Sequence, residues 1–212
     1  YALTTPLITK SDGGKFGKTE DGNVWLDPKK TSPYKFYQFW INVSDNDAIK
    51  FFKIFSLKSQ SEIDYIIKDH EKEPHLRILQ NSLADEITEI VHNRKLLEIA
   101  KSTSNILFGK FTKDDFNDLS EEMMESLSTA VPCIKIKKSD LNNDFKTIIT
   151  ESCKFKIFSS KSELIRMIKN NGLMVNKEKI NNDQYEISDN LHFKKYLLIQ
   201  KGKKNYTFII VE

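Results

Sequence analysis

The stretch KFGKTEDGNVWLDPKKTSPYKFYQFWIN, residues 15–42, joins two segments of very different composition. Its first half lies in a loop-like segment with two lysines, Lys15 and Lys18, and an unusual share of glycine. Four of the chain's seven glycines fall between residues 9 and 27: Gly13, Gly14, Gly17 and Gly22. Its second half starts with Ser32-Pro33, an N-cap residue followed by proline at the first helical position, which is a strong helix start. The sequence therefore predicts a loop over residues 10–31 that leads into a helical region.

The residues of this loop are compatible with three kinds of structure. A surface hairpin loop needs glycines for its turns, and its lysines are simply solvated. A P-loop is disfavoured, because Asp12 occupies the first glycine position of the motif that ends at Gly17-Lys18-Thr19, and a poor helix follows. A mobile loop with glycine hinges could close over a nucleotide and bring its ammonium groups to a leaving pyrophosphate. From the residues alone, the surface loop and the phosphate-binding loop both remain open.

Helical signals continue from residue 32 to about residue 128. Asp45 or Asp47 can cap a helix that runs through Phe55, and Ser59-x-x-Glu62 is a capping box. Pro74 ends that helix, and a long apolar stripe follows at helical spacing. The stripe consists of Leu76, Leu79, Leu83, Ile87, Ile90 and Val91. Further helices are predicted over residues 96–107 and, as one short helix, over residues 116–127. The aromatic run of residues 34–40 could stack on bases, but its helical spacing favours core packing.

The pattern changes at both ends of the chain. Residues 3–9 alternate weakly and are expected to form a strand. Residues 129–144 are a connector with room for a short strand, and residues 160–170 form a helix with a serine cap. The remainder predicts a strand, turn and strand over LMVNKEKI and a β-hairpin that turns near residues 201–205. The predicted fold class is therefore mainly α with a C-terminal α+β domain.

Charge is distributed unevenly along the chain. The net charge is +3, but residues 150–212 carry +5 and residues 1–149 carry −2. The cations of interest lie on the predicted helix and at the predicted hairpin tip: Lys161, Arg166, Lys169, Lys201, Lys203 and Lys204. Such cations suit phosphate contacts on folded RNA, where shape counts more than base edges. From composition alone, ordinary surface lysines remain an equal alternative.

Other polar residues give weaker signals. His70 and His75 have no further ligand nearby, so we expect surface histidines and no protein-bound metal. The acidic residues between 114 and 125 predict a solvated helix face. Cys133 and Cys153 are expected to be reduced, buried thiols of a cytosolic protein. No apolar run approaches the roughly 20 residues that a membrane span needs.

Two motifs carry a resemblance to a known family. KFGKT resembles the KMSKS signature of class I aminoacyl-tRNA synthetases, and residues 3–42 resemble bacterial tyrosyl-tRNA synthetases nearly residue for residue. The resemblance continues more loosely through LADEITEIVHN and into the C-terminal third. There, SSKSELIRMIKNNGLMVNKEKI resembles the alpha-L RNA-binding motif, although Ile165 stands where a second arginine is usual. The matching positions are Ser160, Lys161, Glu163, Arg166, Ile168, Gly172, Val175 and Asn176.

The resemblance implies a domain order and a set of site residues. It implies the end of a catalytic domain with the KMSKS-like loop (1–31), a helical anticodon-binding domain (32–129), a linker (130–144) and an alpha-L RNA-binding domain (145–212). Lys15 and Lys18 would be catalytic. The residues implied to bind ATP, expected as Mg-ATP, are Lys15, Phe16, Gly17, Lys18 and Thr19. The six cations of the basic C-terminal third would bind RNA.

The resemblance also implies an activity and partners. The parent enzyme would be a cytoplasmic tyrosine–tRNA ligase that binds tyrosine, ATP and tyrosine-specific tRNA, and it would be a homodimer. None of the four histidines lies in the His-Ile-Gly-His type motif of this class, so the chain is expected to be a C-terminal portion that is monomeric and inactive alone. The alternatives are a non-catalytic RNA-binding protein related to the synthetase and a protein-interaction module.

Overall fold

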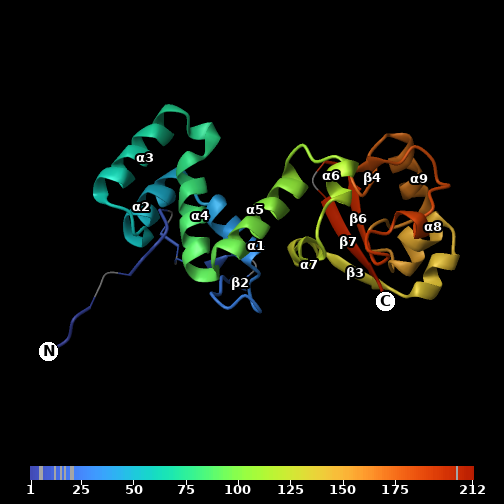
Figure 1. The fold of residues 1–212 in the computed structure, drawn as a ribbon, viewed down its shortest axis with the longest axis horizontal. Coiled ribbons are helices and arrows are strands. Elements are labelled where there is room, and N and C mark those ends of the chain that lie inside the picture. The colour runs from blue at the N-terminus through green and yellow to red at the C-terminus, as the bar shows by residue number, and fades with distance from the viewer. Residues whose placement is uncertain (5–6, 12, 15, 17, 20–21, 204) are drawn as a thin grey trace. The chain divides into compact units, whose positions relative to one another are not determined.

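The structure, a computed structural model, describes residues 1–4, 7–11, 13–14, 16, 18–19, 22–203 and 205–212 (Figure 1). The chain packs as two compact units, Tyr1–Lys101 and Ser102–Glu212. Lys15, Gly17 and Lys204, which the sequence singled out, lie outside the described residues. No helix within the described ranges is long and apolar enough to cross a membrane.

The N-terminal unit is built around one central helix, α4, which packs against α1, α2 and α3. Leu79, Leu83 and Ile87 of α4 are buried, as the apolar stripe predicted, whereas Leu76 lies in a preceding 3-10 turn and is 49% exposed. The elements of this unit are β1 (Lys18–Thr19), β2 (Gly22–Asn23), α1 (Pro33–Ile41), α2 (Asp45–Phe55), α3 (Gln60–Lys72), η1 (Pro74–Leu76), α4 (Ile78–His92) and the start of α5 (Arg94–Phe108).

Side-chain caps explain where these helices begin. Ser32 caps α1 with proline following it, and Ser59 and Glu62 form the predicted capping box of α3. The predicted cap of α2 was wrong, because Ser44 caps this helix by accepting a hydrogen bond from the Asp47 amide. Asp47 is used elsewhere: its carboxylate accepts hydrogen bonds from Ser44 Oγ and the Ser11 amide.

The strand expected over residues 3–9 does not form in the described part of that segment. Leu3 and Leu7, which alternation would place on one face, are 97% and 75% exposed, so that face buries little apolar surface. Weak alternation alone cannot hold a strand, because ladder hydrogen bonds and a buried face supply its stability.

The C-terminal unit contains a five-stranded mixed sheet with the order β3–β7–β6–β4–β5. β3 runs parallel to β7, and the other pairs are antiparallel. The predicted strand–turn–strand and hairpin are confirmed as β4–β5 and β6–β7, and the expected connector contains β3. The strands are β3 (Cys133–Ile136), β4 (Leu173–Val175), β5 (Glu178–Lys179), β6 (Tyr196–Lys201) and β7 (Asn205–Val211).

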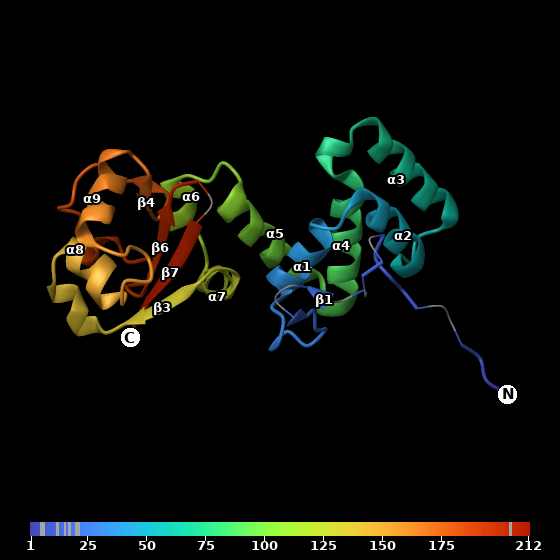
Figure 2. The same ribbon diagram turned by 180° about the vertical axis from the view of Figure 1, so that it is seen from behind.

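Both faces of this sheet are covered (Figure 2). Leu197, Ile199 and Ile209 face a core cluster that includes Phe145 and Leu164, on the side of α8 and α9. Because side chains alternate along a strand, Tyr196, Leu198, Tyr206 and Phe208 lie on the opposite face. That face meets the end of α5, through the hydrogen bond from Tyr206 Oη to the Leu107 carbonyl, and α7. Two-sided burial explains why YLLI of β6 is apolar throughout.

The helices of the C-terminal unit differ in part from expectation. Helix 160–170 is confirmed as α9 (Lys161–Lys169), capped by Ser160. The single short helix predicted over residues 116–127 is instead two, α6 (Lys113–Asn117) and α7 (Glu121–Ala130), since Thr112 and Ser120 each cap a helix. Two further elements were not predicted, α8 (Phe145–Thr147) and the π-helical turn η3 (Ile148–Ser152). Short 3-10 turns occur at η2 (Lys138–Asn142) and η4 (Ser188–Asn190).

Candidate nucleotide loop and RNA-binding face

The glycine-lysine loop continues into a short pair of antiparallel strands. Lys18 pairs with Asn23, and Thr19 with Gly22, through their backbones. The structure describes the backbone of Lys18 and Thr19 only, and Lys15 and Gly17 lie outside the described residues. Phe16, the motif residue between the two lysines, is described with its side chain.

Phe16 inserts into the aromatic cluster of α1 and α2. Its ring centroid lies 4.8 Å from that of Phe51 and 5.3 Å from that of Phe55. The rings of Trp40 and Phe39 follow at 5.7 and 5.9 Å. Aromatic pairs at such separations contribute about 0.5–1.5 kcal/mol beyond the burial of their area. The apolar residue of the motif therefore attaches the loop to the helical region, and the aromatic run packs in the core as predicted.

A second attachment lies at the root of the loop. The Ser11 amide donates to Asp47 Oδ1 at 2.6 Å, and Lys50 Nζ donates to the Thr9 carbonyl at 2.5 Å. Gly13 has φ +83°, a conformation that L-residues rarely adopt, and its amide donates to the Lys10 carbonyl. The start of the segment that leads to the two lysines is thus tied to α2 through Thr9 and Ser11.

A hollow of about 820 Å³ lies beside this loop root. Its lining includes Lys10, Lys30 and Lys35 together with the amide side chains of Gln38 and Asn42. Among the described lining residues the carboxylate is Asp47, and it already accepts the hydrogen bonds from Ser11 and Ser44. The surplus of positive charge suits an anionic ligand.

Replacing the aromatic anchor tests the attachment of the loop. Phe16→Ala removes four ring contacts, so the free energy of unfolding of the N-terminal unit is expected to fall by about 2 kcal/mol, less than for a fully buried Phe. Both tryptophans of the chain, Trp25 and Trp40, lie in this unit, so denaturation followed by tryptophan fluorescence reports it selectively.

Leu26→Ala is the control for this substitution, because Leu26 is close in sequence and 66% exposed. It should leave the midpoint unchanged. Equal midpoints for Phe16→Ala and the parent chain would show that the ring contacts do not hold the loop.

The predicted RNA-binding cations divide into two groups in the structure. Lys161 Nζ lies 2.7 Å from Glu151 Oε1 and donates to Thr147 Oγ1 at 3.0 Å. Lys201 also has partners within the fold, among them Glu163. Arg166 and Lys169 on α9 and Lys203 at the hairpin tip are exposed, and no ion pair involves them within the described part of the chain. The exposed group is therefore the one available to a partner.

Glu163 joins α9 to the β6–β7 hairpin. Its carboxylate lies 2.6 Å from Lys201 Nζ and accepts hydrogen bonds from the amide and hydroxyl of Ser159 at 2.8 and 2.7 Å. Lys201 also donates to the Ile157 carbonyl and lies 4.6 Å from the Phe158 ring centroid. The hydrogen bond from Lys201, followed by those from Ser159, lowers the pKa of Glu163 to about 2. Lys201 therefore holds the fold together as well as carrying charge.

Because the pKa of Glu163 is depressed, the C-terminal unit is expected to lose stability as the pH falls through the acidic range. The contact stabilises the fold fully above the ordinary pKa of about 4.5, and this contribution is lost as the pH falls toward 2. Glu163→Gln should lower the thermal midpoint of this unit at pH 7, and the difference from the parent chain should shrink between pH 5 and pH 2. Scanning calorimetry at several pH values measures this difference.

Glu186→Gln is the matched control, because the Glu186 side chain is exposed and has no described partner. Its difference from the parent chain should be small at every pH. A Glu163→Gln midpoint that stays at a constant distance from the parent midpoint down to pH 2 would contradict the assigned role.

Asn176 fixes the turn between β4 and β5 from inside the fold. Its Nδ2 donates to the Asn190 carbonyl at 2.7 Å, and its Oδ1 accepts from the Leu198 amide at 2.8 Å. The backbone of Asn176 has φ 47° and that of Lys177 has φ 66°, the left-handed pair that a tight hairpin turn requires. These contacts give a physical reason for asparagine at this position of the pattern.

Two side chains lie differently from expectation, and one was missed. His70, predicted at the surface, is 2% exposed, and its Nε2 lies 3.2 Å from Asp45 Oδ1. Cys133 is exposed, whereas Cys153 is buried, and both are free. Lys177 is 8% exposed, although NKEK gives every sign of a solvated turn. In the described ranges no group of three or more His, Cys, Asp or Glu could hold a metal ion.

Both units of the chain are similar to known proteins. The family model "tRNA synthetases class I (W and Y)" matches residues 1–109, and the "Tyrosine--tRNA ligase SYY-like C-terminal domain" matches residues 122–209. The tyrosine–tRNA ligase of Bacteroides fragilis is 47% identical over the whole chain, and that of Flavobacterium johnsoniae is 49% identical. The chain spans about half the length of these relatives, 50% and 49%.

A crystal structure of a C-terminally truncated mitochondrial tyrosyl-tRNA synthetase from Coccidioides posadasii aligns with 47% of this chain and 26% of its own. The identity is 34% and the TM-score is 0.41.

The match over the first 109 residues, which contains the loop and the aromatic cluster, assigns the class. The chain belongs to the class I tRNA synthetases, in the group of the tryptophan and tyrosine enzymes. Within that group it belongs to the bacterial tyrosyl-tRNA synthetase family, because the C-terminal match and the curated relatives are all of the tyrosine type.

Proposed function

We propose that this chain is the tRNA-binding portion of an ATP-dependent tyrosine–tRNA ligase and also supplies its mobile catalytic loop. The observation that carries the proposal is the attachment of Phe16 to α1 and α2, in the segment that matches the class I family. A loop fixed at one apolar residue, with glycines on both sides, can move its two lysines over a nucleotide and still return to a defined position.

In this proposal Lys15 and Lys18 stabilise the triphosphate while tyrosine attacks its α-phosphate. The products are tyrosyl-adenylate and pyrophosphate, and tyrosine then passes to the 3′ end of its tRNA. Phe16, Gly17 and Thr19 complete the loop that contacts ATP, which enters with Mg²⁺. The chain by itself is proposed to be monomeric and inactive.

The domains of the proposal follow the order implied by the sequence. Residues 1–31 end the catalytic domain, residues 32–129 approach the anticodon, and residues 145–212 bind RNA after the linker 130–144. Arg166, Lys169 and Lys203 are the exposed cations available for phosphate contacts, while Lys161 and Lys201 already have carboxylate partners. Lys204, which is also proposed to bind RNA, lies outside the described residues.

The catalytic part is tested in the longer protein that carries the remaining half of the relatives' length. Lys18→Ala should lower the rate of tyrosine-dependent ATP–pyrophosphate exchange about 10²–10³-fold, because one donor to the developing charge is lost. Lys29→Ala, a change at an exposed lysine outside residues 15–19, should leave the rate unchanged. Full exchange activity in Lys18→Ala would exclude the proposed catalytic role of Lys18.

The RNA-binding part is tested by titrating this chain with tyrosine tRNA at several salt concentrations. In Arg166→Gln/Lys169→Gln the log–log salt slope should become shallower by about 2, since each phosphate contact contributes close to 1. Lys137→Gln/Lys138→Gln removes the same charge from exposed lysines elsewhere in the unit and should change the slope little. Equal slopes for the two double variants would contradict a role for α9.

A further inference from the structure

Lys177 is a buried cation that has no carboxylate partner among the described residues. Its side chain is 8% exposed, and its ammonium donates to Tyr206 Oη at 3.0 Å and lies 4.6 Å from the centroid of that ring. Tyr206 Oη in turn donates to the Leu107 carbonyl at 2.6 Å. The neighbouring Glu178 forms its ion pair with Lys113 at 2.5 Å. Burial lowers the pKa of Lys177 to about 8.

This arrangement differs from that of three other lysines packed into the C-terminal unit. Lys146, Lys161 and Lys201 each lie within 3 Å of a carboxylate: Asp183, Glu151 and Glu163. Removing an ammonium from water is costly unless it is paired and hydrogen-bonded. An ammonium has three donors, and one hydrogen bond to a phenol leaves most of that requirement unmet. Groups kept in so unfavourable a state are found preferentially at binding sites.

Lys177 lines a pocket of about 360 Å³ that has the remaining features of an anion site. Lys110 and Lys203, both exposed, contribute two further cations to its lining. No aspartate or glutamate lines the pocket among the described residues. Gln200 adds a polar side chain, and Phe108, 64% exposed, adds an aromatic ring.

The pocket lies on the sheet face opposite α9. Lys201, whose partner Glu163 is on α9, and Gln200 are adjacent in β6, so their side chains point to opposite faces. Met174 and Tyr206 pair with Gln200 in the neighbouring strands and share its face. A ligand in this pocket is therefore bound by residues separate from Arg166 and Lys169.

We propose that this pocket binds a phosphodiester of the RNA, with the Lys177 ammonium at the phosphate, Lys110 and Lys203 beside it, and the adjoining base stacked on Phe108. The proposal rests on the proposed function only in naming RNA as the ligand. Lysine ammonium groups bind phosphates as point charges, and aromatic side chains bind unpaired bases by stacking. The site thus fits an unpaired nucleotide better than the regular backbone of a duplex.

Lys177→Met tests the charge while keeping the length of the side chain. Loss of one buried charge–phosphate contact should weaken binding of tyrosine tRNA by this chain about tenfold. The thermal midpoint of the C-terminal unit at pH 7 should stay equal or rise, because an unpaired buried charge has been removed. Lys179→Met, a change at an exposed lysine two residues further on, should leave both quantities unchanged. Parent-like affinity, or a lowered midpoint together with weaker binding, would overturn the proposal.

Phe108→Ala provides a second test that does not depend on the buried charge. Its exposed ring contributes little to folding, so about tenfold weaker tRNA binding at an unchanged midpoint is expected from the lost stacking. Phe193→Ala removes a 50% exposed ring elsewhere in the unit and is the control. Inorganic phosphate and ATP serve as competitors: displacement of tRNA by either at micromolar concentration in the parent chain, but not in Lys177→Met, would assign the pocket to a free phosphate and overturn the RNA assignment.

These experiments distinguish failure of the pocket proposal from failure of the proposed function. If the parent chain does not bind tRNA, the pocket proposal and the proposed function both fail. If the parent binds, and Arg166→Gln/Lys169→Gln lowers the salt slope while Lys177→Met and Phe108→Ala bind normally, only the pocket is excluded.

Discussion

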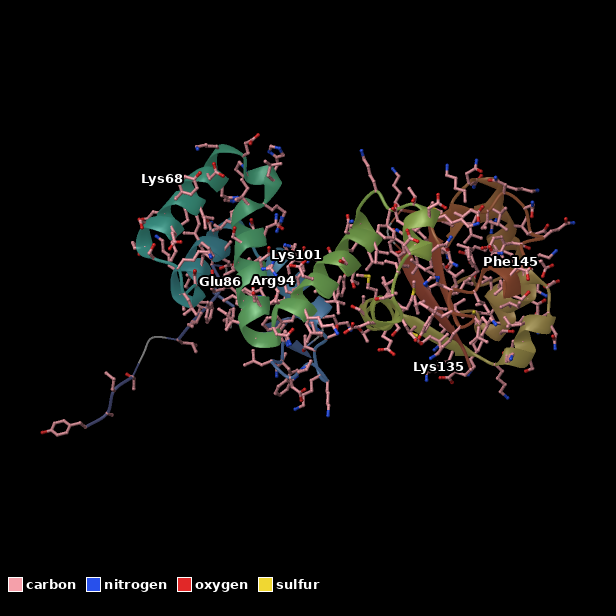
Figure 3. All side chains as sticks on the ribbon, viewed as in Figure 1. Lys68, Glu86, Arg94, Lys101, Lys135 and Phe145 are labelled. Atoms are coloured by element: carbon pink, nitrogen blue, oxygen red, sulfur yellow. The ribbon has the colours of Figure 1, made fainter. Side chains whose placement is uncertain are left out.

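A charged group that the fold removes from water needs a partner, and this requirement organises much of the structure. At three junctions between chain segments, an ion pair or a charge-assisted hydrogen bond is found. Lys50 holds Thr9 to α2, and Lys201 holds the hairpin to α9. Lys101 of α5, labelled in Figure 3, lies 2.6 Å from Asp85 of α4. A chain with 30% charged residues can therefore use some of its lysines as structural ties and leave others for a partner.

The same division separates charge that supports the fold from charge that supports function. Lys201 and Arg166 look equivalent in the sequence, since both belong to the basic C-terminal third. The structure gives Lys201 a carboxylate, a backbone carbonyl and an aromatic ring, and leaves Arg166 exposed. A positive patch counted from sequence overstates the charge that is free to contact RNA.

Local signals predicted most of the helices correctly, because capping and apolar spacing are properties of neighbouring residues. Ser32-Pro33, the Ser59–Glu62 box and Ser160 each placed a helix start. The failures required long-range knowledge. Asp47 was a plausible cap for α2, but it binds the Ser11 amide, 36 positions away. His70 is buried, and its ring contacts Asp45, 25 positions away.

The parts of the candidate site that depend on local sequence were likewise predictable, and the parts that depend on long-range contacts were not. The KFGKT motif named the loop, and the composition of the last third named the basic helix and hairpin. The anchoring of Phe16 by four rings could not be predicted, because Phe39, Trp40, Phe51 and Phe55 lie on two separate helices. The burial of Lys177 is also invisible in NKEK, since it arises when the end of α5 covers the second face of the sheet through Tyr206 and Leu107.

Lys177 and Lys201 show how one physical rule gives opposite results on the two faces of a sheet. Each lies at a strand end or turn of the same sheet, and each ammonium is near an aromatic ring, at 4.6 Å in both cases. The difference is Glu163, which α9 brings to one face. On the other face, Phe108 at the end of α5, Lys110 just after it and Lys203 of the β6–β7 turn line the pocket. On the first face the cation is neutralised within the chain, so its contribution is stability. On the second face no described residue supplies the neutralising charge, which is the basis for the binding site proposed there.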